Sequence, residues 1–168
     1  PVRTVSSHPM EDLRLGNPDD TGSPACIDDA LYTCTRKKDG KLRMTKYHPV
    51  TGEQGWSVSM DLVPHPWLVS LSRADGNVYF AASTTAYHDT VVCMDDRSGA
   101  LHWIKPLSNT TGNGISTILS AVVPVAGRDR TLATDQVCAV VSVTNPLAPT
   151  NGSGIWVWNA TGILAARI

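Results

Sequence analysis

An internal repeat constrains the fold of this chain more than any other feature. Residues of three different types recur at a spacing of 47 positions: Tyr32 with Tyr79, Gly52 with Gly99, and Trp56 with Trp103. Short apolar segments and polar turns alternate around these markers. A period of about 40 to 50 residues with several short strands is typical of β-propeller blades, because one blade cannot bury both of its faces alone.

The second copy shows what the repeated residues do. Residues 90 to 104 read as a strand, a polar corner ending at Gly99, and a second strand. Glycine tolerates the positive φ that a tight turn requires. Trp103, four residues later, offers a large apolar surface that can fill the space between neighbouring blades. We therefore expect these positions to build and dock blades.

A third copy is present but degenerate. Gly162 follows Gly99 by 63 residues, so this unit carries 16 extra positions, and Ala166 stands where the other copies have Trp. The sequence predicts a loop-rich N-terminal segment (1–27) and three units at about 28–62, 72–107 and 115–168. The expected fold class is all-β: a partial propeller with blades of short antiparallel strands. A β-sandwich with similar hairpins is the alternative.

At this point the sequence resembles a known family. Asp75-Gly76-Asn77-Val78-Tyr79 and the segment from Met94 to Trp103 are similar to the repeat of PQQ-like, or quinoprotein alcohol dehydrogenase-like, β-propellers. The resemblance covers about residues 28 to 168, with His48 in the first copy where the second has Asp95. Family propellers have seven or eight blades. We therefore expect the ring to be completed by more of the same polypeptide or by other chains.

The resemblance also implies a chemistry that the residues here do not repeat. Family enzymes bind PQQ and a calcium ion, using two adjacent cysteines and a catalytic Asp. No two cysteines are adjacent in this chain, and Asp95 and Asp96 belong to the repeated turn. From the sequence we expect no cofactor and no enzymatic activity.

Other catalytic and binding signals are weak. The five histidines lack metal-ligand spacing, and the nucleophile-elbow and phosphate-loop motifs are absent. The best candidate contact is the segment Pro64-His65-Pro66-Trp67, because two prolines reduce the entropy lost when His65 and Trp67 bind a partner. A net charge of -1 gives no field that would attract nucleic acid, and no apolar run is long enough to insert into a membrane.

Four cysteines leave the redox state open: Cys26, Cys34, Cys93 and Cys138. Three disulfide pairings are conceivable, and the sequence does not choose among them. A Cys26–Cys34 bridge is the easiest closure, because the residues between them can turn the chain. Cys93 and Cys138 lie in apolar runs and are equally consistent with buried free thiols.

Three N-glycosylation sequons favour an extracellular or secretory-lumenal location: Asn109, Asn151 and Asn159. Glycans on these residues are therefore expected partners in a secreted protein. Asn159 lies inside the repeated turn, where Asn also has a conformational reason to occur.

These observations favour a non-catalytic propeller that acts as a scaffold or protein-interaction module of an extracellular or lumenal glycoprotein. Its expected partners are other protein chains or the remainder of its own propeller. One alternative is a structural subunit of a surface filament or larger assembly. The other is a fragment of a PQQ/calcium-dependent quinoprotein dehydrogenase.

Overall fold

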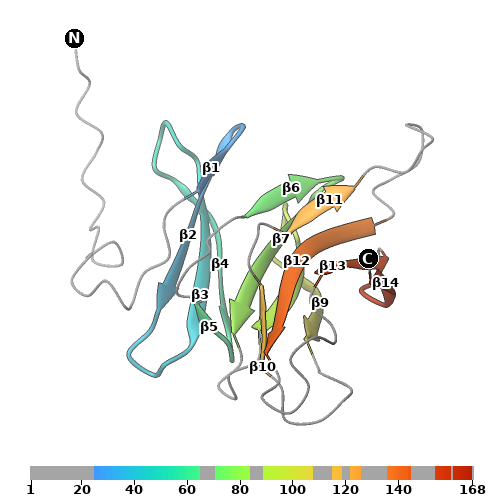
Figure 1. Ribbon diagram of the computed structural model, residues 1–168. Coiled ribbons are helices and arrows are strands. Elements are labelled where there is room, and N and C mark those ends of the chain that lie inside the picture. Colours follow the sequence, from blue (N-terminus) through green and yellow to red (C-terminus); the bar gives the residue numbers. More distant parts are fainter. Residues whose placement is uncertain are drawn as a thin grey trace.

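Alternating apolar and polar residues in short runs produce a chain of β-strands. The structure, a computed structural model, describes residues 25–64, 71–83, 89–107, 115–118, 122–125, 136–144, 154–159 and 161–167. Every regular element in these ranges is a strand, and no helix long enough to cross a membrane occurs there. The strands form three antiparallel sheets that lie side by side in chain order (Figure 1).

The three sheets share one plan, in which the last three strands of each sheet are hydrogen-bonded neighbours in chain order. The first contains β1 (Ala25–Ile27), β2 (Ala30–Arg36), β3 (Leu42–Tyr47) and β4 (Gln54–Met60). In the second, β5 (Val63–Pro64) and β6 (Ser72–Ala74) both pair with β7 (Asn77–Ser83), followed by β8 (Asp89–Asp95) and β9 (Leu101–Pro106). In the third, β10 (Ile115–Ile118) and β11 (Val123–Val125) pair with β12 (Gln136–Thr144), followed by β13 (Gly154–Asn159) and β14 (Leu164–Arg167).

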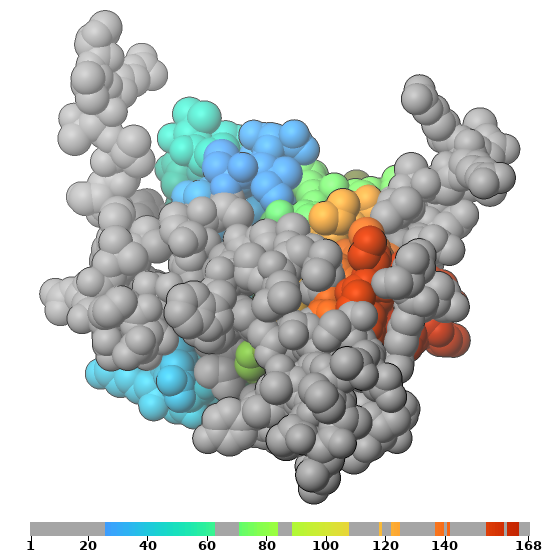
Figure 2. Space-filling model, viewed as in Figure 1, coloured from blue at the N-terminus to red at the C-terminus, as the bar shows by residue number. Residues whose placement is uncertain are grey.

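Each sheet is a propeller-type blade, so the predicted all-β, partial-propeller fold is confirmed. A sandwich has two sheets around one core, whereas here three sheets follow one another, from the blue and cyan residues to the orange and red ones in Figure 2, with one core at each of the two boundaries. The first blade begins at Ala25 and so includes three residues of the segment 1–27.

Register explains the repeat of 47 residues. Lys46 is opposite Trp56 in the first blade, Cys93 is opposite Trp103 in the second, and Val157 is opposite Ala166 in the third. Next to each of these pairs, towards the turn, the ladder has a register shift of the β-bulge kind. The same strand position and the same irregularity therefore recur in all three blades.

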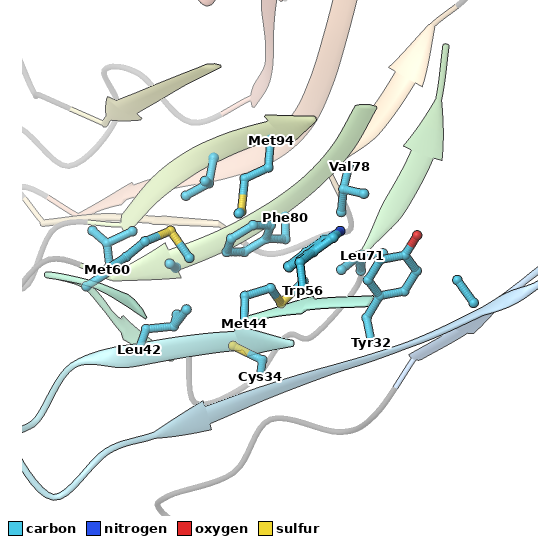
Figure 3. Packing of buried hydrophobic residues seen from close by; sticks show 14 residues of the cluster. Tyr32, Cys34, Leu42, Met44, Trp56, Met60, Leu71, Val78, Phe80 and Met94 are labelled. Carbon is cyan, nitrogen blue, oxygen red and sulfur yellow. The ribbon is translucent and has the colours of Figure 1, made fainter. Parts of the chain in front are cut away.

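Two apolar cores join the blades. The first lies between the first and second blades and includes Trp56, Met44 and Phe80 (Figure 3). The second lies between the second and third blades and includes Tyr79 and Trp156. Alternate residues of a strand point to opposite faces, so the middle blade contributes to both cores. This explains why β8 is buried along almost its whole length.

Candidate functional site

The repeated glycine and tryptophan meet across blade boundaries. Gly99 has φ of +72°, and a Cβ atom there would lie 2.7 Å from Cδ2 of Trp56, a residue of the preceding blade. The indole Nε1 of Trp56 donates a hydrogen bond of 2.9 Å to the backbone oxygen of Asp96. Glycine is required at this turn for two reasons: the positive φ and the close approach of the ring.

The same contact recurs one blade further on. A Cβ atom at Gly162, where φ is +76°, would lie 2.8 Å from Cδ2 of Trp103 and 2.7 Å from the Cε atom of Lys105. Each described Trp of this type therefore docks on the turn glycine of the following blade. Trp156 and Trp158 lie elsewhere, buried in the second core with ring centroids 6.2 Å apart.

A side chain before each turn glycine accepts a backbone hydrogen bond. Asp95 Oδ1 accepts from Ser98 N at 2.7 Å, and Asn159 Oδ1 accepts from Thr161 N at 3.1 Å. In the first blade, His48 Nδ1 accepts from Thr51 N at 3.2 Å. His48 thus makes the bond that Asp95 makes in the second copy. The hydroxyl and backbone N–H of Ser98 also lower the pKa of Asp95.

Asp96 forms the most concentrated polar cluster of the described residues. Its carboxylate is buried and accepts hydrogen bonds from the Tyr32 hydroxyl and from Lys46 Nζ, the latter at 2.8 Å. The guanidinium Nη2 of Arg73 lies 2.7 Å from its other oxygen. Burial and the neighbouring Asp96 carboxylate raise the pKa of Tyr32.

This Asp96 cluster belongs to the blade interface, since Tyr32 and Lys46 come from the first blade while Asp96 and Arg73 come from the second. Every oxygen of the carboxylate has a cationic or hydroxyl partner, so Asp96 acts as a fixed interfacial anion. Sequence reasoning missed the cluster. One signal was present: Asp96 is a charged residue within the turn at a position where the first copy has Pro49.

A second buried carboxylate links the middle and third blades. Asp89 Oδ1 accepts a hydrogen bond from the hydroxyl of Ser83 at 2.8 Å, and Oδ2 accepts from the backbone N–H of Ile118 at 2.6 Å. Asp89 therefore satisfies the backbone of β10 from the neighbouring blade, which is a structural role.

The four cysteines are free thiols, and the strand faces explain why. Cys26 is opposite Leu31, so its side chain is on the face of the first sheet that Leu31 occupies, whereas Cys34 is on the other face. Cys93 belongs to the second core between Tyr79 and Val91. Cys138 alternates with Val137 and Ala139, which point into that same core, so it points away from Cys93. The Cys26–Cys34 bridge, the easiest closure among the pairings that the sequence left open, is therefore not formed.

Burial also sets the acidity of two of these thiols. It raises the pKa of Cys34 to about 12 and that of Cys93 to about 11, from an ordinary value of 9.0. Thiols of this kind are inert packing groups at neutral pH.

Several predicted sites lie outside the described residues: Asn109, Asn151, His65 and Trp67. Asn159 is described, and its Oδ1 also accepts hydrogen bonds from the hydroxyl of Thr161 and the N–H of Ile163, both at 2.8 Å. Glycosylation of the three sequons and the extracellular location stay predictions.

The described residues do not form a calcium site. In the parts of the chain that the structure covers, no group of three His, Cys, Asp or Glu residues is placed to hold a metal ion. The buried carboxylates, Asp89 and Asp96, already have protein partners.

Comparison with known proteins supports the fold. No family model and no curated protein matches the chain. Among solved structures, a europium-containing methanol dehydrogenase matches with a TM-score of 0.53 and 13% identity, over 86% of this chain and 24% of the other. The chain thus spans about a quarter of that protein's length. At this identity the match shows a propeller-type fold and no more.

This comparison corrects the functional expectation. The sequence favoured a non-catalytic scaffold, but a solved structure that these blades resemble is a methanol dehydrogenase. The match favours the quinoprotein dehydrogenase alternative over the scaffold.

Proposed function

We propose that these three blades are a fragment of a quinoprotein dehydrogenase propeller that oxidises an alcohol. The observation that carries the proposal is the structural match of 86% of the chain to a methanol dehydrogenase. The repeat points the same way, because Asp75-Gly76-Asn77-Val78-Tyr79 and the turn before Trp103 are similar to the repeat of alcohol dehydrogenase-like propellers. Both arguments rest on blade architecture. Because function belongs to sites placed on a fold, the activity itself has to be tested.

Within such an enzyme, the described residues would form and fix part of the propeller wall. Trp56 on Gly99 and Trp103 on Gly162 hold successive blades together, and the buried Asp96 and Asp89 satisfy polar groups at the same two boundaries. Residues that hold a calcium ion would come from parts of the propeller outside the described residues, which place no group of three His, Cys, Asp or Glu for a metal ion.

The test is a dye-linked assay on the intact natural polypeptide, supplied with PQQ and either calcium or europium. We expect dye reduction that requires both methanol or ethanol and PQQ. The same polypeptide without PQQ is the control, and circular dichroism checks that it is folded. A folded polypeptide that neither binds PQQ, followed by PQQ absorbance, nor reduces the dye would rule out the proposal.

A further inference from the structure

The face of the first blade that points away from the second blade is polar. In the second blade, the equivalent face has an apolar row across β7, β8 and β9 that packs in the first core: Phe80, Val92 and Ile104. The row that lies 47 positions earlier, across β2, β3 and β4, consists of hydroxyl residues: Thr33, Thr45 and Ser57. Thr45 Oγ1 and Ser57 Oγ are hydrogen-bonded at 2.9 Å. These three residues define the hydroxyl face of the first blade, which differs in chemistry from a face that packs in an apolar core.

The middle of the hydroxyl face is covered within the chain itself. Thr33 and Thr45 are 4% and 3% exposed, whereas Ser57, on the last strand of the sheet, is exposed. The second and third sheets lie on the opposite side of this blade, beyond the core that includes Trp56 (Figure 1). The cover therefore lies over β2 and β3. It should bring hydrogen-bonding groups, because an apolar surface would offer the buried hydroxyls no further partner.

The segment 1–24 is best placed to supply this cover. It leads directly into β1, which pairs with β2 in the same sheet. An extended segment of this length reaches about 80 Å, far more than the width of a four-stranded sheet, which is about 15 Å. The internal parts of the chain outside the described ranges are attached at both ends to the second or third blade. Reach and attachment therefore both favour the segment 1–24.

The charges of this segment and of the first blade are complementary. The β2–β3 hairpin, at one end of the hydroxyl face, has five basic residues and one acidic residue: Arg36, Lys37, Lys38, Lys41 and Arg43, with Asp39. Residues 11–20 have four acidic residues and one basic residue: Glu11, Asp12, Asp19 and Asp20, with Arg14. Arg43 is two positions from Thr45 on the same strand, so it lies on the same face. Opposite charges at these places favour association of the two parts.

We propose that residues 1–24 pack on the hydroxyl face as a strap, with their acidic part against the basic β2–β3 hairpin. A further blade of the repeat type fits this face less well. The blade faces of this chain that point towards a following blade present apolar groups, such as those of Met44 and Trp56, and most of these cannot pair with hydroxyls. This contact does not depend on the proposed dehydrogenase activity.

Photo-crosslinking of the intact natural polypeptide tests the contact. The probe variant is Ser57→benzoylphenylalanine, because Ser57 is exposed and adjacent to Thr45. The matched control is Leu101→benzoylphenylalanine, at a residue of the second blade that is 45% exposed. Each variant is irradiated as an equimolar mixture of unlabelled and heavy-nitrogen-labelled chains, and the cross-linked peptides are identified by mass spectrometry. The isotope mixture distinguishes cross-links within one chain from those between two copies.

We expect cross-links to residues 1–24 of the same chain to be at least about tenfold more abundant from position 57 than from position 101, because a segment held on the face has a high effective concentration there. Adding Asp19→Lys and Asp20→Lys should reduce their yield severalfold, since these residues would then repel the hairpin. An unchanged yield would overturn the proposal, as would cross-links from position 57 chiefly to another part of the polypeptide or to a second copy, or no excess over position 101. Circular dichroism checks folding; should the Ser57 variant be unfolded, Ser59, exposed on the same face of β4, takes its place.

Discussion

Gly99 illustrates how one residue fixes a blade boundary. An alanine there would keep the left-handed backbone, at a cost of about 1–2 kcal/mol, and its Cβ would press on the Trp56 ring at 2.7 Å. Overpacking of this kind adds about 1–3 kcal/mol. We therefore expect Gly99→Ala to lower the free energy of unfolding by about 2–5 kcal/mol, measured by urea denaturation.

Gly76→Ala separates the cost of backbone strain from the cost of overpacking against Trp56 that Gly99→Ala adds. Gly76 has nearly the same φ, +73°, but nothing lies near its Cβ position, so only the backbone cost of about 1–2 kcal/mol applies. Equal losses in the two variants would show that the Trp56 ring yields without cost, contrary to the docking argument.

Cys34 gives the protein a specific sensitivity to alkali. Burial raises its pKa to about 12 from 9.0, so its contribution to stability is complete below pH 9 and is lost as pH rises towards 12. The slope of that loss is about 1.4 kcal/mol per pH unit. In Cys34→Ala we expect a smaller loss of unfolding free energy between pH 9 and pH 11 than in the unmodified protein. Urea midpoints at each pH measure it.

Cys26 supplies the control for this titration. Cys26→Ala removes an exposed thiol from the same sheet and so shows what the loss of a thiol does where no core packing is lost. Burial also raises the pKa of Cys93 to about 11 and that of Tyr79 to about 12. Part of the alkaline loss of unfolding free energy therefore remains in both variants. Parallel curves for Cys34→Ala and the unmodified protein would contradict the assignment.

At the scale of the strand–turn–strand element, three different side chains perform one task. His48, Asp95 and Asn159 each accept a backbone N–H inside the turn. His48→Ala removes this acceptor and should cost about 0.5–1.5 kcal/mol. His48→Asn should stay within about 0.5 kcal/mol of the unmodified protein, since an Asn side chain, that of Asn159, also accepts the N–H of the residue before the turn glycine in the third blade. Thermal denaturation compares them; equal destabilisation would show that the ring of His48, not its acceptor, matters.

Elements were predictable from sequence to the extent that local chemistry determines them. The turn glycines predict turns because positive φ is a local property, and the 47-residue spacing of the Gly and Trp markers predicts the blade. The Asp96 cluster could not be predicted, because its partners Tyr32, Lys46 and Arg73 meet only when two blades dock. The sequence could not choose among the cysteine pairings for a related reason: the register that places Cys26 and Cys34 on opposite faces depends on where β1 begins.

The carboxylate of Asp96, in a turn of the second blade, contacts side chains of the first blade and so joins the two blades. Asp96→Asn would remove the charge that faces Lys46 and Arg73, whose side chains are 20% and 25% exposed. Charged hydrogen bonds contribute about 1.5–3 kcal/mol, and we expect a loss in that range by urea denaturation. Asp95→Asn is the matched control and should be nearly neutral. Equal effects would show that Asp96 does not couple the blades.

Across the whole molecule, the middle blade contributes one face to each of the two cores. A substitution on one of these faces should perturb one core and leave the other intact. Phe80 is buried in the first core, so Phe80→Ala should cost about 3–5 kcal/mol. Because each blade packs only on its neighbours, stability should depend on local interfaces, as in other repeat proteins. Hydrogen exchange should therefore accelerate more in β2–β4 than in β12 and β13, which contact the middle blade through Tyr79, Val91 and Cys93. An equal increase in all three blades would instead show that the two cores open as a single cooperative unit.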